Sequence, residues 1–177
     1  MSPDSVFREV FLNPGDYAFG DEQTRLRTIL GSCVAVTFWH PTLRIGAMCH
    51  YLLPSRAPGQ PGPPGGKYAN EIIALIAERF KSQNILPGDL EVKMFGGSSM
   101  FPGLTLGESL SIGTKNIHMG LAILNRSGFN ILNYDLAGGT NRTVVFELWS
   151  GEVWVRQGQP QTSEGRSTTP SGKGHPA

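Results

Sequence analysis

The sequence lacks three features that would place it in a common functional class at once. Its 177 residues carry 15 basic and 14 acidic side chains, for a net charge of +1, and this balance argues against a nucleic-acid-binding or membrane-surface protein. Two cysteines are too few to cross-link a secreted scaffold. No apolar run reaches the ~18 residues of a membrane-spanning helix, and the first ten residues lack the apolar core of a secretory signal. We therefore expect a soluble, cytoplasmic protein with no nucleic-acid partner and no membrane insertion.

Two segments are short of hydrophobic residues, and both are predicted to lie outside the packed core. Apart from prolines, the last twenty residues, 158–177, hold one apolar side chain, Ala177, and we expect a disordered tail there. The internal stretch 54–67 is dominated by proline and glycine, and it is predicted to be a flexible loop between a strand and a helix. The remaining length, residues 1–157, suits one domain.

Hydrophobic periodicity predicts more strands than helices. One helix is indicated by an apolar stripe at helical spacing, formed by Ala69, Ile72, Ile73, Ile76 and Phe80. A second helix is expected from Thr114, a candidate N-cap, to Gly128, a candidate C-cap glycine. The β-rich segments are Val10–Leu12, Thr24–Leu30, Cys33–Trp39, Ile45–Leu53, Leu90–Phe95, Phe129–Tyr134, Thr143–Trp149 and Glu152–Arg156, the last two joined as a hairpin around Ser150–Gly151. Because several strands are adjacent in sequence, the pattern indicates a mostly antiparallel, layered α+β domain.

The segment from Thr28 to Pro54 holds the strongest candidate for chemistry. If its two strands form a hairpin that turns at Pro41–Thr42, Cys33 and His50 lie directly opposite one another on one face, with Cβ atoms about 4.5–5.5 Å apart. An imidazole at that distance accepts the thiol proton, and the thiolate then attacks a carbonyl carbon. The backbone N–H groups of Ser32 and Cys33 are candidate donors to the resulting oxyanion.

A purely structural role for Cys33 stands beside the catalytic one, because free cysteines are mostly buried and act as small hydrophobic side chains. Cys49 is assigned to the core, since it has the opposite parity to His50 on the same strand and should face away from Cys33, which argues against a disulfide. No spacing typical of a zinc site is present. The group that orients the histidine stays open among Thr28, Ser32, Ser98 and Ser99.

Several separated motifs resemble the CheD family of chemoreceptor glutamine deamidases. They follow the family's order and spacing from about Phe11 to Arg156, and they are LGSCVAV (30–36), MCHYLLP (48–54), KYAN (67–70), GGSSMF (96–101), IGTKN (112–116) and GGTNR (138–142). The sequence departs from the family pattern in its longer, Pro/Gly-rich loop at 54–66, in the segment after Arg156, and in having Asn70 where an aspartate is expected.

The resemblance implies a cysteine hydrolase that converts selected glutamine side chains of chemoreceptors to glutamate and releases ammonia. It implies Cys33 as the nucleophile, His50 as the base and an upstream threonine as the third residue, for which Thr28 is the best candidate. The implied fold is a layered α/β sandwich with two main helices packed outside, similar to the cysteine hydrolase fold of a deamidating bacterial toxin. No metal or organic cofactor is needed for this chemistry.

The resemblance also implies partners. These are methyl-accepting chemoreceptors, as substrates, and a CheC-type chemotaxis phosphatase, with recruitment to receptor arrays at the membrane. Two other functions stay open. A non-catalytic chemotaxis adaptor would keep the fold and bind these partners without using the thiol, whereas a thiol redox protein would use Cys33 and Cys49 together, which the parity argument disfavours.

Overall fold

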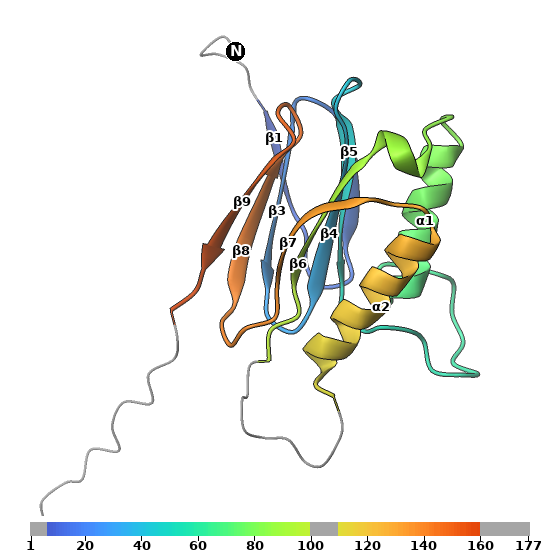
Figure 1. The fold of residues 1–177 in the computed structure, drawn as a ribbon, viewed down its shortest axis with the longest axis vertical. Helices are drawn as coiled ribbons and strands as arrows, with labels where there is room; N and C mark the ends of the chain where they lie inside the picture. The colour runs from blue at the N-terminus through green and yellow to red at the C-terminus, as the bar shows by residue number, and fades with distance from the viewer. Residues whose placement is uncertain (1–6, 100–109, 160–177) are drawn as a thin grey trace, which may run out of the picture.

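The chain folds into three layers (Figure 1), as seen in a computed structural model that describes residues 7–99 and 110–159. A four-stranded sheet packs against a five-stranded sheet, and two helices cover the other face of the five-stranded sheet. In the described residues, five of the seven strand pairings are antiparallel. The predicted α+β class, with mostly antiparallel sheets and two helices outside, is confirmed.

The four-stranded sheet has the order β1-β3-β8-β9. Its strands are β1 (Arg8–Phe11), β3 (Thr24–Leu30), β8 (Arg142–Glu147) and β9 (Glu152–Gln157). The predicted hairpin joins β8 to β9, and Gly151 in its turn has a φ of +75°, which favours glycine because it has no Cβ. The inward-facing residues of β3 and β8 supply one wall of the core between the sheets.

The five-stranded sheet has the order β2-β5-β4-β6-β7. Its strands are β2 (Tyr17–Gly20), β4 (Val34–His40), β5 (Ile45–Tyr51), β6 (Glu91–Gly96) and β7 (Ile131–Leu136). The sequence pattern does not predict β2, whose four residues are exposed or half-buried and too few to show an alternating pattern. β4 and β5 lie near the centre of the sheet and alternate between its two faces, so one face packs on the helices and the other on the four-stranded sheet.

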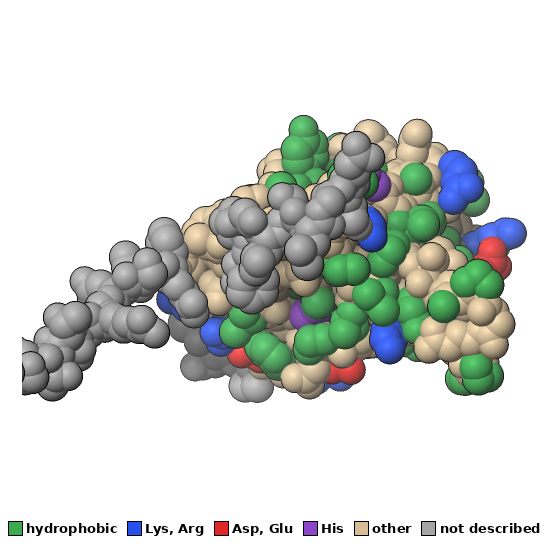
Figure 2. Space-filling model, turned by 90° about the horizontal axis from the view of Figure 1, so that it is seen from below, with side chains coloured by type: hydrophobic (Ala, Val, Ile, Leu, Met, Phe, Trp, Pro, Cys, Tyr) green, Lys and Arg blue, Asp and Glu red, His purple; other side chains and the backbone are tan. Residues whose placement is uncertain are grey.

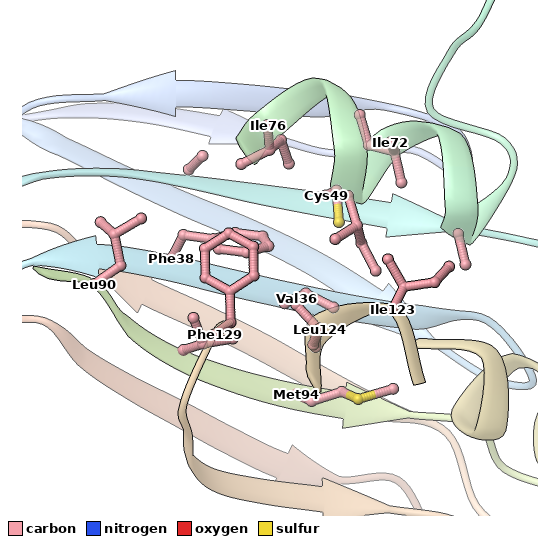
Figure 3. Close-up of a cluster of buried hydrophobic side chains, with 14 of the residues drawn as sticks. Val36, Phe38, Cys49, Ile72, Ile76, Leu90, Met94, Ile123, Leu124 and Phe129 are labelled. Carbon is pink, nitrogen blue, oxygen red and sulfur yellow. The ribbon is translucent and has the colours of Figure 1, made fainter. Parts of the chain in front are cut away.

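The helices are α1 (Ala69–Lys81) and α2 (Ile112–Arg126), with a short 3₁₀ helix, η1 (Pro87–Asp89), before β6. Helix α1 buries the apolar stripe that the sequence predicted. Figure 3 shows the core between the helices and the five-stranded sheet, where Val36 and Cys49 from the strands meet Ile72 and Ile123 from the helices. Helix α2 also meets β5 and β6, because Gly120 lies against Tyr51 and Met94.

The prediction was wrong at the N-terminal end of α2 and correct at its C-terminal end. Its N-cap is Ser111, whose hydroxyl accepts the backbone N–H of Thr114 at 3.2 Å, so Thr114 lies in the first turn and the prediction that it caps the helix is wrong. Ser111, three residues before Thr114, accepts the hydrogen bond from a backbone N–H group that has no partner within the first turn of the helix. Gly128 follows the helix with a φ of +81°, as predicted.

The Pro/Gly-rich loop lies between β5 and α1, as the sequence predicted. Arg56 organises it: its guanidinium pairs with Glu71 on α1 at 2.7 Å and donates to the carbonyl oxygens of Pro61 and Pro63. The predicted tail lies outside the described residues from residue 160 onward. Neither α1 nor α2, the α-helices in the described part of the chain, is long and apolar enough to cross a membrane.

Candidate active site

The β4–β5 hairpin has a different register from the one that the sequence suggested. His50 pairs with Ala35, and Cys33 lies immediately before β4. The turn spans residues 41–44, so that its centre lies one position later than expected, and Arg44 is in the left-handed region at a φ of 51°. The prediction that Cys33 directly opposes His50 is therefore wrong, because a single-sequence argument could not locate the centre of the turn.

The shift preserves the face of the sheet, since it moves the partner of His50 by two residues and side chains alternate with a period of two. Cys33 packs against the cluster of buried side chains between the two sheets, to which Ala35 belongs. It is thus a diagonal neighbour of His50, a position that in a regular sheet is about 7–8 Å away between Cα atoms and still within reach of a long side chain.

Thr28 and His50 meet across the two sheets. The hydroxyl oxygen Oγ1 of Thr28 lies 2.7 Å from His50 Nδ1 and 2.7 Å from the carbonyl oxygen of Leu12, and both side chains are buried. A carbonyl only accepts, so the single hydroxyl proton of Thr28 goes to Leu12, and Thr28 accepts the Nδ1–H of His50. This assignment puts the free lone pair of the ring on Nε2.

The second ring nitrogen is available for chemistry. His50 Nε2 is buried and has no hydrogen-bond partner among the described residues. Burial lowers the pKa of His50, and the Leu12 carbonyl and the Asp16 carboxylate oppose this effect only in part. The imidazole is therefore neutral at pH 7, as a general base must be before it takes a proton.

The two cysteines occupy different environments. Cys33 is partly exposed, and loss of solvation raises the pKa of its thiol above the ordinary value of 9.0. Cys49 lies in the core between sheet and helices, where burial raises the pKa of its thiol to about 12. The predicted core position of Cys49, on the face opposite Cys33, is confirmed. Both are free thiols. Because the pKa of Cys33 is raised and that of His50 is lowered, both side chains are neutral at pH 7, and any nucleophilic attack by Cys33 would require transfer of its thiol proton to a base.

Three consecutive carbonyl groups hold the loop that carries Cys33. The backbone N–H of Ser98 donates to the carbonyl oxygen of Gly31 at 2.9 Å, the side chain of Asn116 to that of Ser32 at 3.0 Å, and the N–H of Gly97 to that of Cys33 at 2.8 Å. Ser98 thus supports the loop that carries Cys33, while Thr28 is the residue that contacts the histidine. The alternative candidates for that contact in the sequence are Ser32, Ser98 and Ser99.

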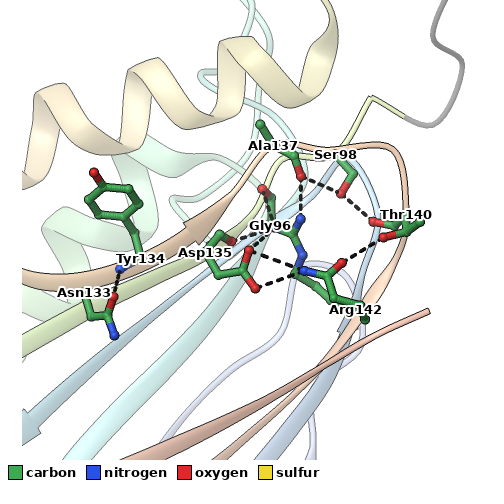
Figure 4. A network of polar contacts seen from close by, with 9 residues as sticks. Gly96, Ser98, Asn133, Tyr134, Asp135, Ala137, Thr140 and Arg142 are labelled. Carbon is green, nitrogen blue, oxygen red and sulfur yellow. Dashed lines mark hydrogen bonds and ion pairs between the residues drawn. The ribbon is translucent and has the colours of Figure 1, made fainter. Parts of the chain in front are cut away.

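A buried arginine, Arg142, holds the ends of β6 and β7 together (Figure 4). Arg142 on β8 donates to the carbonyl oxygens of Gly96, Asp135 and Ala137. Beside it, the hydroxyl of Ser98 donates to the carbonyl of Thr140 at 2.7 Å. Arg142 and Asn116 were not among the candidate site residues in the sequence. Their only signal was a place in the quoted motifs, because a buried polar residue looks like an exposed one in a single sequence.

The loop before β4 and the first turn of α2 lie at the same end of the fold, the lower end in Figure 1. Seen from this end, hydrophobic side chains form a band across the surface (Figure 2). A groove of about 670 Å³ is lined by Pro54, Leu110 and one side of α2. In residues 7–99 and 110–159, no three His, Cys, Asp or Glu side chains are grouped so that they could hold a metal ion.

Comparison with known proteins gives a consistent result. The family model described as "CheD chemotactic sensory transduction" matches residues 52–157, a range that begins two residues after His50. A protein of Pseudomonas syringae pv. syringae is 40% identical over 149 residues, which cover 84% of each chain, and is named "Probable chemoreceptor glutamine deamidase CheD". A protein of Dechloromonas aromatica, "Probable chemoreceptor glutamine deamidase CheD 3", is 37% identical over 92% of this chain and 95% of its own.

Among solved structures, the Bacillus licheniformis protein YfiH matches 70% of this chain and 51% of its own, with a TM-score of 0.47 and 12% sequence identity. The family match and the curated relatives agree over most of the chain, as the motifs in its sequence suggested. The chain therefore belongs to the CheD family.

Proposed function

We propose that this protein deamidates glutamine side chains of chemoreceptors, with Cys33 as the nucleophile, His50 as the general base and Thr28 as the residue that orients the base. One observation carries the assignment of roles: Thr28 Oγ1 lies 2.7 Å from His50 Nδ1, which leaves the other ring nitrogen buried and unpartnered among the described residues. The substrate class comes from the names of the relatives in the CheD family.

The first half of the reaction forms a thioester. His50 Nε2 takes the thiol proton as Cys33 Sγ attacks the carboxamide carbon, and the carbonyl oxygen of the substrate becomes an oxyanion. The backbone N–H of Cys33 is the donor we assign to that oxyanion. The carbon–nitrogen bond then breaks, and the imidazolium gives its proton to the leaving nitrogen, which departs as ammonia.

The second half regenerates the enzyme. A water molecule gives a proton to His50 Nε2 and attacks the thioester carbon, and the thiolate of Cys33 leaves and recovers the proton from the imidazolium. The net change is glutamine plus water to glutamic acid plus ammonia. The glutamic acid ionises at neutral pH, so each event adds one negative charge to the receptor.

The experiment uses the full chain and a purified cytoplasmic fragment of a methyl-accepting chemoreceptor. Intact mass spectrometry follows the gain of about 1 Da per event that replacement of an amide by an acid gives, and a coupled assay follows ammonia. We expect Cys33→Ala and His50→Ala to abolish both signals. Cys49→Ala is the matched control, because it removes the other thiol from the far face of the same sheet and should keep the activity.

A wild-type rate in Cys33→Ala would refute the assignment of the nucleophile. Receptor binding by the wild type without any mass change would instead indicate a non-catalytic adaptor. Receptors, and a CheC-type phosphatase, are proposed as partners, and co-purification of each with the full chain tests them separately from the chemistry.

A further inference from the structure

Helix α2 carries a buried polar side chain that the reaction described above does not use. Asn116 is fully buried, and its Nδ2 donates to the carbonyl oxygens of Ser32 at 3.0 Å and Leu52 at 2.7 Å. Both partners only accept, so the orientation of the side-chain amide is settled. Ser32 directly precedes Cys33, and Leu52 follows His50 by two residues, so one side chain ties together the two segments that carry the catalytic pair.

The contact with Ser32 fixes the direction of one backbone donor. The carbonyl of Ser32 and the N–H of Cys33 belong to a single peptide unit, which is planar and trans, so they point in opposite directions. When Asn116 holds that carbonyl toward α2, the N–H of Cys33 points away from the helix. The neighbouring peptide units are held as well, by Ser98 on the Gly31 carbonyl and by Gly97 on the Cys33 carbonyl.

The helix that presents Asn116 has little freedom to move. The hydroxyl of Tyr51 donates to the backbone carbonyl of Asn116 at 2.7 Å. At the first turn of α2, Gly113 approaches the backbone of Gly97 so closely that a Cβ atom on it would clash with the Gly97 carbonyl. A donor that stabilises an oxyanion must be held in place before the reaction begins, and this packing supplies a rigid support.

The same side chain also leaves a polar group unsatisfied. Asn116 Oδ1 is buried and has no hydrogen-bond partner among the described residues. An unmatched buried acceptor lowers stability, and polar residues that break the rules of a well-satisfied core are expected at functional sites. The two hydrogen bonds that Nδ2 donates must therefore offset the cost of the unmatched Oδ1.

We propose that Asn116 is a positioning residue, which aims the backbone N–H of Cys33 at the oxyanion formed from the substrate carboxamide. The inference rests on the proposed function and adds a role for α2 in it. If Asn116 has this role, its loss should slow the attack on an amide, which forms an oxyanion, but should leave the intrinsic reactivity of the Cys33 thiol unchanged.

The test compares two reactions of the same cysteine. In Asn116→Ala, we expect kcat for deamidation of the receptor fragment to fall about 10- to 100-fold, with KM changed by less than about threefold. Alkylation of Cys33 by iodoacetamide creates no oxyanion and should keep its rate within about twofold. The matched control is Asn130→Ala, which removes an exposed asparagine just before β7 and should leave both reactions unchanged.

A second variant guards against loss of folding. Asn116→Ser keeps a hydroxyl donor that is too short to bridge both carbonyls, and it should show the same separation of the two rates. The inference is overturned if kcat stays within twofold of wild type, if deamidation and alkylation fall together, or if both variants unfold, since Asn116 would then serve only the thiol's environment or the fold. A wild-type chain that alkylates but never deamidates would instead refute the proposed function.

Discussion

Replacement of Thr28 by valine removes one hydroxyl from the centre of the site and leaves the shape of the side chain nearly unchanged. In the wild-type protein this hydroxyl donates to the Leu12 carbonyl and accepts from His50 Nδ1, each at 2.7 Å, with no exposure to solvent. Thr28→Val strands both partners in the interior. It therefore probes the stability of the fold and the orientation of the base together.

The two effects have different sizes. Each stranded buried group costs about 1–3 kcal/mol, so the free energy of unfolding should fall by about 2–6 kcal/mol, against a total of about 5–15 kcal/mol for a typical domain. Loss of the Thr28 acceptor also lets the ring of His50 carry its proton on Nε2 instead of Nδ1. If the hydrogen bond favours the productive tautomer by about 2 kcal/mol, kcat falls about 30-fold.

The assay measures kcat for deamidation of the receptor fragment alongside unfolding by urea. Thr24→Val is the matched control: Thr24 lies on the same face of β3, is equally buried, and bonds through its hydroxyl to Asp21 rather than to His50. It should lose stability but keep kcat. A Thr28→Val variant with wild-type kcat, or a Thr24→Val variant with an equal loss, would refute the orienting role of Thr28.

Three further predictions follow from the pKa shifts and the packing. Because burial lowers the pKa of His50, kcat/KM should fall on the acid side with a midpoint below pH 6.5. Because the pKa of Cys33 is raised, any alkaline fall should lie above pH 9.0. An acid midpoint above pH 7 in a profile from pH 5 to 10 would contradict this prediction. Iodoacetamide at pH 8 should label Cys33 in the native protein but reach Cys49, with its pKa of about 12, only after unfolding, as peptide mapping will show. Gly113→Ala should lower the free energy of unfolding by about 1–3 kcal/mol, measured by thermal unfolding, and should lower kcat, because the new Cβ would clash with the backbone of Gly97 after β6. Gly88→Ala, where a Cβ meets no other atom, should change neither quantity.

Local pattern in the sequence was enough for every helix and strand discussed above except β2 and η1, and for the faces of the strands. The stripe of α1 and the alternation in β5 rest on periodicities of 3.6 and 2.0 residues, which each segment displays by itself. For that reason the core position of Cys49, and the placement of Cys33 and His50 on one face, survived an error in register. The motif segments around these residues also indicated the CheD family.

Contacts between layers were decided only by the tertiary structure. The β4–β5 register depends on a four-residue turn with Arg44 in the left-handed region, a conformation that periodicity does not encode. Thr28 reaches His50 from the other sheet, and Asn116 reaches Ser32 from a helix 84 positions away in the sequence. Such partners are chosen by how the layers dock, and the free energy of docking comes from buried surfaces spread over the whole domain, so no short stretch of the chain records which polar groups will meet.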